Sequence, residues 1–241
     1  RKPCGDTFPV QASSSEHTRC PPALFRSIAM PYTTTENTCI MFLVRHAATL
    51  NNIARPPRIQ GLGDDIGLSD EGRRQAQATA DFLAEQEITR AFCSPLARAV
   101  ETASIIAEPH SLTPSPVPQL HEVDVGRWEG CSWVDIERDE PEAHHRFVTD
   151  PATLGYAGGE NLTQVQQRVL PAVGQLLQDQ VGKVFLVVGH NVVNRVLLAT
   201  LLHVPLAKAR GVDQDNCGVN IIRYRDGQTK VLTTNAAFHL R

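Results

Sequence analysis

Short runs of consecutive apolar residues alternate along the chain with longer segments in which apolar residues recur at helical spacing. Residues 40–44 and 184–188 are apolar at every position, which is typical of strands buried on both faces of a sheet. Residues 88–93 form a third short run and predict another strand. All three runs are far shorter than a helix that spans a bilayer.

Each of these strands is followed by a segment with helical periodicity. The first predicted helix begins after Ser69, a residue type that caps helices, with acidic residues in its first turn. We predict further helices over residues 94–107, 161–180 and 192–202. Pro171 lies inside the second of these and weakens its predicted continuity, because proline lacks the backbone N–H.

The alternation of strands and helices predicts an α/β fold in a single domain, with a mostly parallel central sheet flanked by helices on both faces. Residues 219–224 and 230–234, joined near an Asp-Gly pair, predict a closing hairpin. The domain is expected to cover residues 38–241. Residues 1–37 are rich in Ser, Thr and Pro without apolar periodicity, so we predict a disordered extension, with a transit-like leader as the alternative.

Composition narrows the choice of ligands. The formal net charge is -3, so nothing draws the whole surface to nucleic acid or to an anionic membrane, and we expect neither partner. The 6 cysteines are dispersed and none has C-x-x-C spacing, which argues against a zinc knuckle and for reduced thiols in the cytoplasm. His144 and His145 are adjacent and point apart, so they do not predict a metal site.

Both fully apolar strands end directly before a histidine. His46 follows Arg45 at the end of the first strand, His190 follows the second, and Arg98 lies early in the helix after the third. Ligands of such sheets bind at the carboxyl ends of the strands, so we expect these four side chains around one cavity. A phosphate dianion is the simplest ligand, because guanidinium groups bind its oxygens bidentately.

A histidine in such a cavity can act as a nucleophile towards phosphorus while its ring is neutral. The leaving alkoxide needs a proton, and Glu122 is the best candidate for the acid, since a nearby dianion favours its protonated form. We expect the helix N-termini after His190 and Pro95 to add N–H donors to the phosphate. Alone, each residue has an ordinary structural interpretation, and only their joint placement favours catalysis.

Several motifs, in a fixed order along the chain, carry a family resemblance. They are LVRHAATLNN at residues 43–52, RIQG at 58–61, LSDEGRRQA at 68–76, SPLARAVET at 94–102, LHE at 120–122, GRWEG at 126–130, GGE at 158–160 and VGH at 188–190. Together they resemble the histidine phosphatase superfamily, which includes the phosphoglycerate mutases. The match covers nearly everything from residue 39 onward.

The resemblance implies a role for each matching residue. It implies that His46 is the nucleophile, that Glu122 is the proton donor and later the base, and that no metal or other cofactor is needed. The residues that it implies for phosphate and substrate binding are Arg45, Asn52, Arg98, His190 and Asn191. Ala47, Ala48, Asn51 and Asn191 depart from the residues common in the family at these positions.

The resulting prediction is a phosphatase that acts on a small phosphorylated metabolite. A phosphoglycerate mutase and, less favoured, a catalytically silent phosphate-binding protein are the alternatives. In the mutases, an extra segment follows the acid-bearing loop, here residues 120–130, and shields the phosphohistidine from water. Residues 131–158 are compact and lack the mutase motif, which favours water as the acceptor of the phosphoryl group. We expect a loop over residues 133–156 to select the substrate. The sequence does not identify the substrate or the oligomeric state.

Overall fold

The structure is a computed structural model that describes residues 31–241. Residues 1–30, which make up most of the predicted N-terminal extension, lie outside the described residues. Tyr32 packs edge-on against Phe42, with 5.8 Å between the ring centroids, and its N–H donates to Gln86 Oε1. Ordered contacts therefore begin before the first strand.

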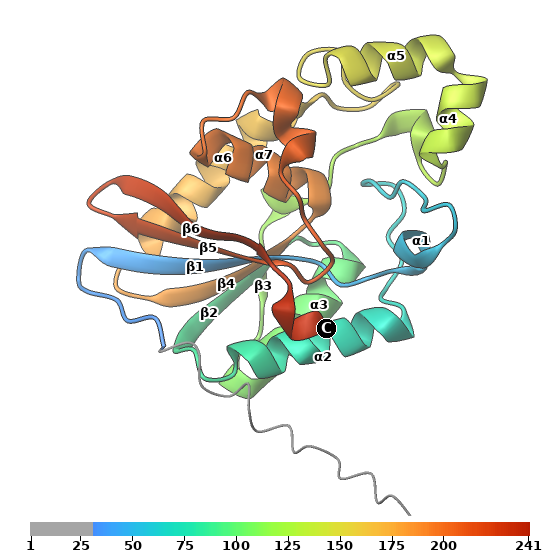
Figure 1. Ribbon diagram of the computed structural model, residues 1–241. Helices are drawn as coiled ribbons and strands as arrows, with labels where there is room; N and C mark the ends of the chain where they lie inside the picture. The colour runs from blue at the N-terminus through green and yellow to red at the C-terminus, as the bar shows by residue number, and fades with distance from the viewer. Residues whose placement is uncertain (1–30) are drawn as a thin grey trace, which may run out of the picture. The chain divides into compact units, whose positions relative to one another are not determined.

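Six strands form a single sheet in the order β3-β2-β4-β1-β5-β6 (Figure 1). Their bounds are β1 Thr38–Arg45, β2 Ile88–Cys93, β3 Ser115–Pro116, β4 Val184–Gly189, β5 Val219–Arg225 and β6 Gln228–Ala236. β1, β2, β3 and β4 pair in parallel, whereas β5 and β6 add an antiparallel hairpin at one edge. The predicted mostly parallel sheet and its closing hairpin are confirmed.

β1 and β4 occupy the centre of the sheet because they are apolar at nearly every position. They pair in parallel with Arg45 opposite Gly189, so both chains leave the sheet at the same edge. Alternate residues of β1 pack into different cores. Met41 faces α6 (Leu162–Asp179) and α7 (Asn191–Leu201), while Phe42 faces α3 (Ala97–Ala107). Burial on both faces explains the uninterrupted apolar runs.

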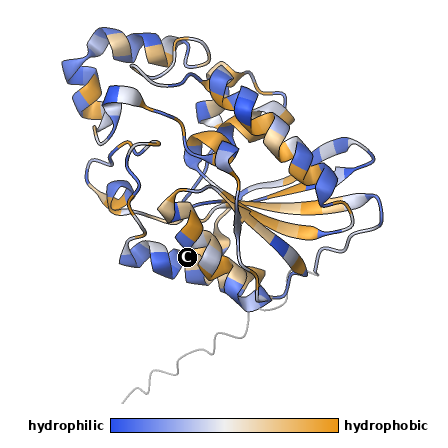
Figure 2. Cartoon of the chain, turned by 180° about the vertical axis from the view of Figure 1, so that it is seen from behind, coloured by the Kyte–Doolittle hydropathy of each residue, from blue (hydrophilic) through white to orange (hydrophobic). Residues whose placement is uncertain are grey.

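Helices cover both faces of the sheet (Figure 1). The longer ones are α2 Asp70–Leu83, α3 Ala97–Ala107, α6 Leu162–Asp179 and α7 Asn191–Leu201. The remaining ones are α1 Leu50–Ile53, η2 Glu108–His110, η3 Pro118–Leu120, η4 Gly126–Trp128, α4 Trp133–Asp139, α5 Pro141–Thr149, η5 Leu206–Gly211 and η6 Phe238–Leu240. Figure 2 shows apolar strands inside and polar outer helix faces. Among residues 31–241, no helix is both long and apolar enough to cross a membrane.

Helix boundaries follow local chemistry closely. The Ser69 hydroxyl accepts from the Gly72 N–H at the start of α2, and Asn161 forms a capping box at the start of α6. α6 continues through Pro171. α3 begins at Ala97 rather than at residue 94, because Leu96 takes the extended backbone conformation of the N-cap.

The predicted loop over residues 133–156 is wrong, because this segment forms α4 and α5. The Ser132 hydroxyl accepts from the Asp135 N–H and caps α4, and a proline opens α5. Ile136 is the buried residue of α4 and Phe147 that of α5. With so few buried positions, these helices leave no apolar periodicity to detect.

Candidate active site

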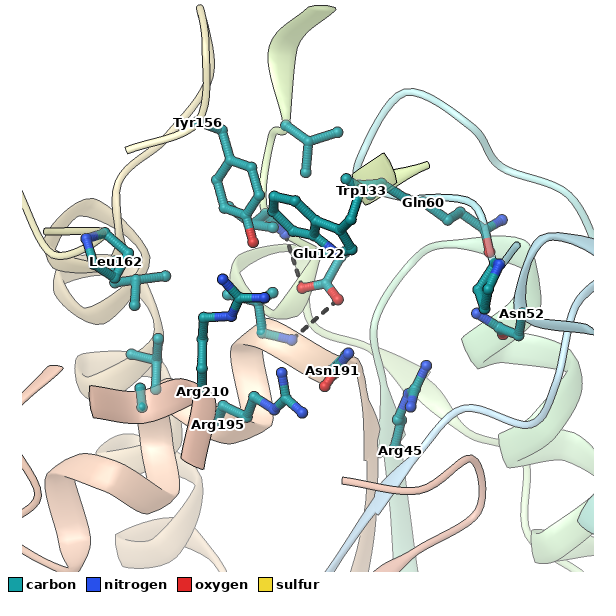
Figure 3. Close-up of a pocket in the computed structure, with 18 of the residues that line it drawn as sticks. Arg45, Asn52, Gln60, Glu122, Trp133, Tyr156, Leu162, Asn191, Arg195 and Arg210 are labelled. Carbon is teal, nitrogen blue, oxygen red and sulfur yellow. Dashed lines mark hydrogen bonds between the residues drawn. The ribbon is translucent and has the colours of Figure 1, made fainter. Parts of the chain in front are cut away.

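A cavity of about 330 Å³ opens at the carboxyl edge of the parallel strands (Figure 3). Of the predicted site residues, Arg45, His46, Asn52, Glu122 and Asn191 line it directly. Segments from β1, α1, the acid-bearing loop and α7 therefore meet at one place, as the strand-end argument predicts. Arg98 and His190 are fully buried beside His46.

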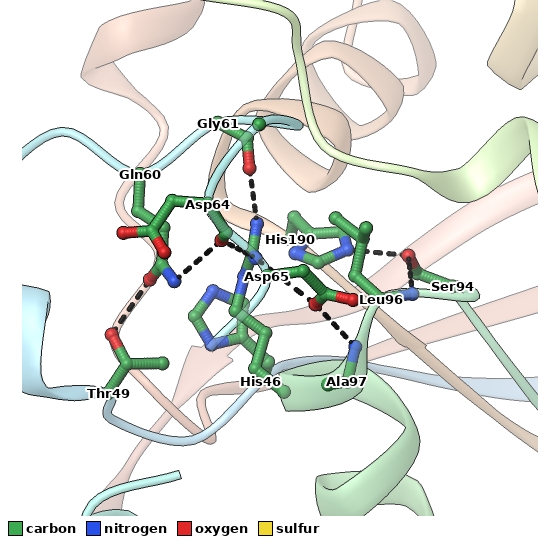
Figure 4. Close-up of polar contacts among 12 residues, drawn as sticks. His46, Thr49, Gln60, Gly61, Asp64, Asp65, Ser94, Leu96, Ala97 and His190 are labelled. Atoms are coloured by element: carbon green, nitrogen blue, oxygen red, sulfur yellow. Dashed lines mark hydrogen bonds and ion pairs between the residues drawn. The ribbon is translucent and has the colours of Figure 1, made fainter. Parts of the chain in front are cut away.

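The two strand-end histidines lie near one another (Figure 4), and His46 lines the cavity. The ring centroids of His46 and His190 are 5.2 Å apart, and both residues are almost completely buried. The backbone N–H of His46 donates to the Gly189 carbonyl, so the β1–β4 hydrogen-bond ladder continues to the histidine. The parallel register of the sheet thus sets the distance between the rings.

The His46 ring is held in one tautomer. Nδ1 lies 2.8 Å from the Ala47 carbonyl oxygen, and a carbonyl only accepts, so Nδ1 carries the hydrogen. Nε2 is left with its lone pair. Burial, followed by the charges of Arg45 and Arg98, lowers the pKa of His46 well below its usual value. This shift favours the neutral imidazole at neutral pH.

The His190 ring is held from its other nitrogen. Nε2 lies 2.7 Å from the Ser94 hydroxyl at the end of β2 (Figure 4). Its Nδ1 is buried and has no hydrogen-bond partner among residues 31–241. Burial, with Arg98 as the next cause, also lowers the pKa of His190 well below its usual value. The sequence analysis did not predict this hydrogen bond between Ser94 and His190.

Arg98 is fully buried, yet carbonyl groups hold it rather than a close carboxylate. Its Nη1 donates to the Asp64 carbonyl at 2.9 Å and its Nη2 to the Gly61 carbonyl at 2.8 Å. The nearest carboxylate oxygen, on Asp65, is 4.0 Å away. Neutral acceptors orient the guanidinium without cancelling its charge, so an anion in the cavity can still be attracted to it.

Arg45 and Asn52 bring further donors to the cavity. Arg45 Nη1 donates to the Gln214 carbonyl at 2.6 Å, and burial lowers its pKa to about 10, so it stays charged at neutral pH. The Asn52 side-chain oxygen accepts from the Thr49 N–H and from the Asn216 amide. The amide N–H groups of Asn52 remain for a ligand. Asn216 also lines the cavity and was missed by the sequence analysis.

Glu122 is 2% exposed and accepts three backbone hydrogen bonds. Its Oε1 accepts from the N–H groups of Val123 and Val193, and its Oε2 accepts from Val192 at 3.2 Å (Figure 3). The N-terminus of α7 therefore points its amides at this carboxylate. The prediction that these amides bind phosphate is wrong.

The backbone N–H groups at the N-terminus of α3 also donate to side chains of the protein. The Ala97 N–H donates to Asp65 Oδ1 at 2.6 Å (Figure 4), and the Leu96 N–H donates to the Ser94 hydroxyl. Both predicted helix N-termini thus bind side chains of the protein. The cationic character of the cavity beside His46 comes from the guanidinium groups of Arg45 and Arg98 instead.

A partly buried ion pair holds the acid-bearing loop. Arg168 on α6 pairs with Glu160 at 2.9 Å and donates to the carbonyls of Gln119, His121 and Glu122. Glu160 in turn accepts a hydrogen bond from the backbone N–H of Asp124 in the loop. These contacts tie the loop that carries Glu122 to α6, and the sequence analysis did not predict them.

The turn after His46 is fixed by α2 and α3. The Ala47 N–H donates to the Thr102 hydroxyl, and the Ala48 carbonyl accepts from Ser69. A Cβ added to Gly72 would lie 2.0 Å from the Ala48 oxygen, so α2 approaches this turn as closely as a glycine allows. Both alanines are buried and neither lines the cavity.

The far end of the cavity has a different lining. Trp133, Phe147 and Tyr156 form an aromatic wall, and Arg195 and Arg210 present guanidinium groups (Figure 3). Arg195 lies one helical turn after Asn191, a spacing that puts both on the same face of α7.

Metal-binding chemistry has no counterpart in the described residues. Within residues 31–241, no group of three or more His, Cys, Asp or Glu side chains is arranged to hold an ion. The cavity lining contains one carboxylate, that of Glu122. The geometry defines an α/β protein with a buried imidazole, that of His46, in a cavity lined by guanidinium groups.

Comparisons with known proteins agree with this class. The family model of the histidine phosphatase superfamily (branch 1) matches residues 41–237. The chain belongs to the histidine phosphatase superfamily.

Named relatives include both phosphatases and mutases. Phosphoserine phosphatase 1 of Hydrogenobacter thermophilus is 31% identical over 200 residues, which cover 83% of this chain and 93% of that protein. A probable phosphoglycerate mutase, GpmB of Yersinia pestis, is 32% identical over 186 residues, or 77% of this chain and 85% of that protein. The structure of Bacillus stearothermophilus YhfR superimposes with a TM-score of 0.78 at 28% identity, covering 84% of this chain and 100% of YhfR.

Proposed function

We propose that this chain is a phosphatase that hydrolyses small phosphomonoesters through a phosphohistidine on His46. The observation that carries the proposal is the orientation of that ring. Nδ1 is bound to the Ala47 carbonyl, so the lone pair on Nε2 belongs to a buried, neutral imidazole beside Arg45 and Arg98. Phosphoryl transfer needs such a nucleophile, with cations around the equatorial oxygens.

In the first step, the lone pair of His46 Nε2 attacks phosphorus and the bond from phosphorus to the ester oxygen breaks. Glu122 gives its proton to the leaving alkoxide and becomes a carboxylate. Arg45, Arg98 and His190 stabilise the charge on the phosphoryl oxygens, and Asn52 donates an amide N–H. Asn191, whose buried side-chain oxygen has no partner in the described part of the chain, orients the substrate.

In the second step, the Glu122 carboxylate takes a proton from water, and the water oxygen attacks phosphorus. The phosphorus–Nε2 bond breaks, which returns the electron pair to His46 and releases inorganic phosphate. No metal or cofactor enters either step. The three backbone amides that surround Glu122 stabilise its carboxylate between the steps.

A phosphoglycerate mutase is the second candidate, supported by the 32% identity to a probable mutase of Yersinia pestis. Both activities use the same phosphohistidine and differ in the acceptor. We favour water, because residues 131–158 are short and the helices they form contribute side chains to the wall of the cavity. We also propose a cytoplasmic location, in keeping with the free thiols of Cys39, Cys93, Cys131 and Cys217.

Hydrolysis of phenyl phosphate, with and without a chelator, tests the proposal. We expect turnover that the chelator leaves unchanged, and an acid-labile, alkali-stable phosphoenzyme whose phosphate maps to His46 by mass spectrometry. Efficient interconversion of phosphoglycerates with little hydrolysis would favour the mutase. Absence of turnover by the folded wild-type protein would refute the phosphatase.

A further inference from the structure

We propose that Gln214 is a positioning residue of the phosphate end, the part of the cavity beside His46 and Arg45. Its backbone carbonyl fixes the Arg45 guanidinium, and its side chain is held by a buried cluster of amides that includes Asn194 and Asn220. The inference rests on the proposed function, since it concerns how Arg45 is directed at a phosphoryl group. None of these three amide residues belongs to a motif of the family resemblance, and none lines the cavity.

The Arg45 side chain has a single hydrogen-bonded anchor within residues 31–241. Arg45 lines the cavity (Figure 3), and its Nη1 donates to the Gln214 carbonyl at 2.6 Å. Its buried Nε has no partner in the same part of the chain, and no carboxylate oxygen there lies within 4.0 Å of the guanidinium. An arginine side chain has large rotamer freedom. The direction of Arg45 therefore depends on where the Gln214 carbonyl points.

The Gln214 side chain forms a two-way amide pair with Asn220 on β5. Its Oε1 accepts from Asn220 Nδ2 at 2.9 Å, and its Nε2 donates to Asn220 Oδ1 at 3.0 Å. Asn194 on α7 adds a longer hydrogen bond of 3.4 Å to the same Oε1. Asn194 and Asn220 are fully buried, and Gln214 is 4% exposed. Buried amides cost free energy unless their hydrogen bonds are made, so the pair strongly favours this one arrangement.

Asn220 ties this pair to the central sheet. Its Nδ2 donates at 3.0 Å to the carbonyl of Leu43 on β1, two residues before Arg45, and its Oδ1 accepts from the Asn235 N–H on β6 at 2.8 Å. Together with the bonds to Gln214, these use every donor and acceptor of the Asn220 amide. The strands therefore hold Gln214 in register with the strand end that carries Arg45.

The loop between η5 and β5, which carries Gln214, also contacts the nucleophile. Asn216 Nδ2 donates to the His46 backbone carbonyl at 2.9 Å. The His46 ring, however, is oriented by the Ala47 carbonyl, which is not part of this loop. Replacing the Gln214 amide should therefore misdirect Arg45 and leave the nucleophilic ring in place.

Gln214→Met tests the inference, because methionine keeps the length of the side chain and loses the amide. kcat/KM for phenyl phosphate should fall by about 10–100-fold, as for a displaced charged group in an active site. Ki for inorganic phosphate should rise by about tenfold, and Ki does not depend on the fraction of folded molecules. Gln86→Met is the matched control. Gln86 is also buried, accepts from the Tyr32 N–H and precedes β2, at the edge of the sheet opposite the cavity, so both values should stay unchanged.

A double-mutant cycle shows whether Gln214 acts through Arg45. In the Arg45→Met background, Gln214→Met should change Ki for phosphate by less than about twofold, because the guanidinium that it misdirects is gone. Arg90→Met, at an exposed position of β2 outside the cavity, is the control background, in which Gln214→Met should keep its full effect. Asn220→Leu removes the amide partner without changing the loop and should show the same coupling to Arg45.

Two outcomes overturn different claims. If the wild type hydrolyses phenyl phosphate, but Gln214→Met leaves Ki for phosphate unchanged or raises it equally with and without Arg45, the positioning role is wrong and the phosphatase stands. If the wild type hydrolyses no phosphate ester, the proposed function itself fails. Calorimetric titration with inorganic phosphate then measures the same cycle as Kd values, and a coupling absent from these values refutes the positioning role as well.

Discussion

The two ends of the cavity are built in different ways. At the phosphate end, His46 and Arg98 are buried and oriented by backbone carbonyls at the edge of the sheet. At the far end, Arg210 is exposed and rests on the rings of two short helices, α4 and α5. A fixed reactive centre beside a wall made of peripheral helices lets the wall vary without disturbing the chemistry. Substitutions at the two ends should therefore change different kinetic parameters.

The largest effect is expected from removing the nucleophile. His46→Ala deletes the nitrogen that would form the bond to phosphorus, so kcat should fall by about 10⁴-fold or more. The phosphoenzyme, detected by mass spectrometry at alkaline pH because phosphohistidine is acid-labile, should disappear as well. Arg90→Met is the matched control. A phosphoenzyme that persists in His46→Ala would show that another residue carries the phosphoryl group.

Glu122→Gln should lower kcat for alkyl phosphates by roughly 10²–10⁴-fold, since an alkoxide needs a proton to leave. The loss should be smaller for p-nitrophenyl phosphate, whose leaving group is stable as an anion. Gln supplies one acceptor oxygen where the carboxylate supplies two, so the substitution also removes a hydrogen bond that supports the fold. A loss of folding lowers kcat for both substrates equally, and the ratio between them therefore reports proton donation. Equal losses for both substrates would contradict the role of proton donor.

The ion pair that holds the acid-bearing loop offers an indirect way to disturb the phosphate end. Arg168→Met removes the donor to three loop carbonyls and leaves Glu160 unpaired, so the free energy of unfolding should fall by about 3 kcal/mol. If the pair positions Glu122, kcat for alkyl phosphates should fall more than kcat for p-nitrophenyl phosphate.

A double-mutant cycle with Glu160→Gln provides the control for this prediction. The two single substitutions break the same pair, so their effects on stability and on the leaving-group ratio should be less than additive. Full additivity would show that Arg168 and Glu160 do not act as a pair. An equal kcat loss for both substrates would show that Arg168 supports the fold without positioning Glu122.

Stability should depend on pH through the buried histidines. The pKa values of His46 and His190 are lowered in the folded state, so between those values and about 6.5 the unfolded chain binds more protons. The free energy of unfolding should then decrease as the pH falls below about 6.5, by up to about 1.4 kcal/mol per pH unit for each histidine. Urea unfolding at a series of pH values measures this slope.

The slope should become shallower in His46→Asn, because one of the titrating groups is gone. His145→Asn, at an exposed position of α5, is the matched control and should keep the wild-type slope. A slope that is the same in both variants would show that His46 is not protonated on unfolding in this range.

The contrast between the two ends also explains what the sequence could predict. The apolar runs of β1 and β4 are strong signals because both faces of these strands are buried, and a site histidine lies two residues after the end of each run. The chain order alone therefore brought His46, His190 and Arg45 together. Arg98 followed from the same argument, because its helix starts where a neighbouring parallel strand ends.

The far end left no comparable signal. α4 and α5 bury little besides Ile136 and Phe147, so their periodicity is invisible, although the Ser132 cap and the proline that opens α5 were local cues. Arg195 and Arg210 owe their position to tertiary contacts, with a loop carbonyl and with aromatic rings from another segment. The amides of α7 were assigned to phosphate because no sequence pattern shows that Glu122 lies over that helix N-terminus.

The smallest effect should come from the aromatic support of the far end. Trp133→Leu keeps an apolar wall but removes the ring on which Arg210 rests, and a cation–π contact at an exposed site contributes about 0.5–1 kcal/mol. The free energy of unfolding should then fall by at least about 0.5–1 kcal/mol, which urea unfolding measures. Trp133→Phe retains an aromatic face and should lie between leucine and the wild type. If Trp133→Leu and Trp133→Phe lower the free energy of unfolding equally, Trp133 contributes only apolar contact, and the orientation of Arg210 must come from elsewhere.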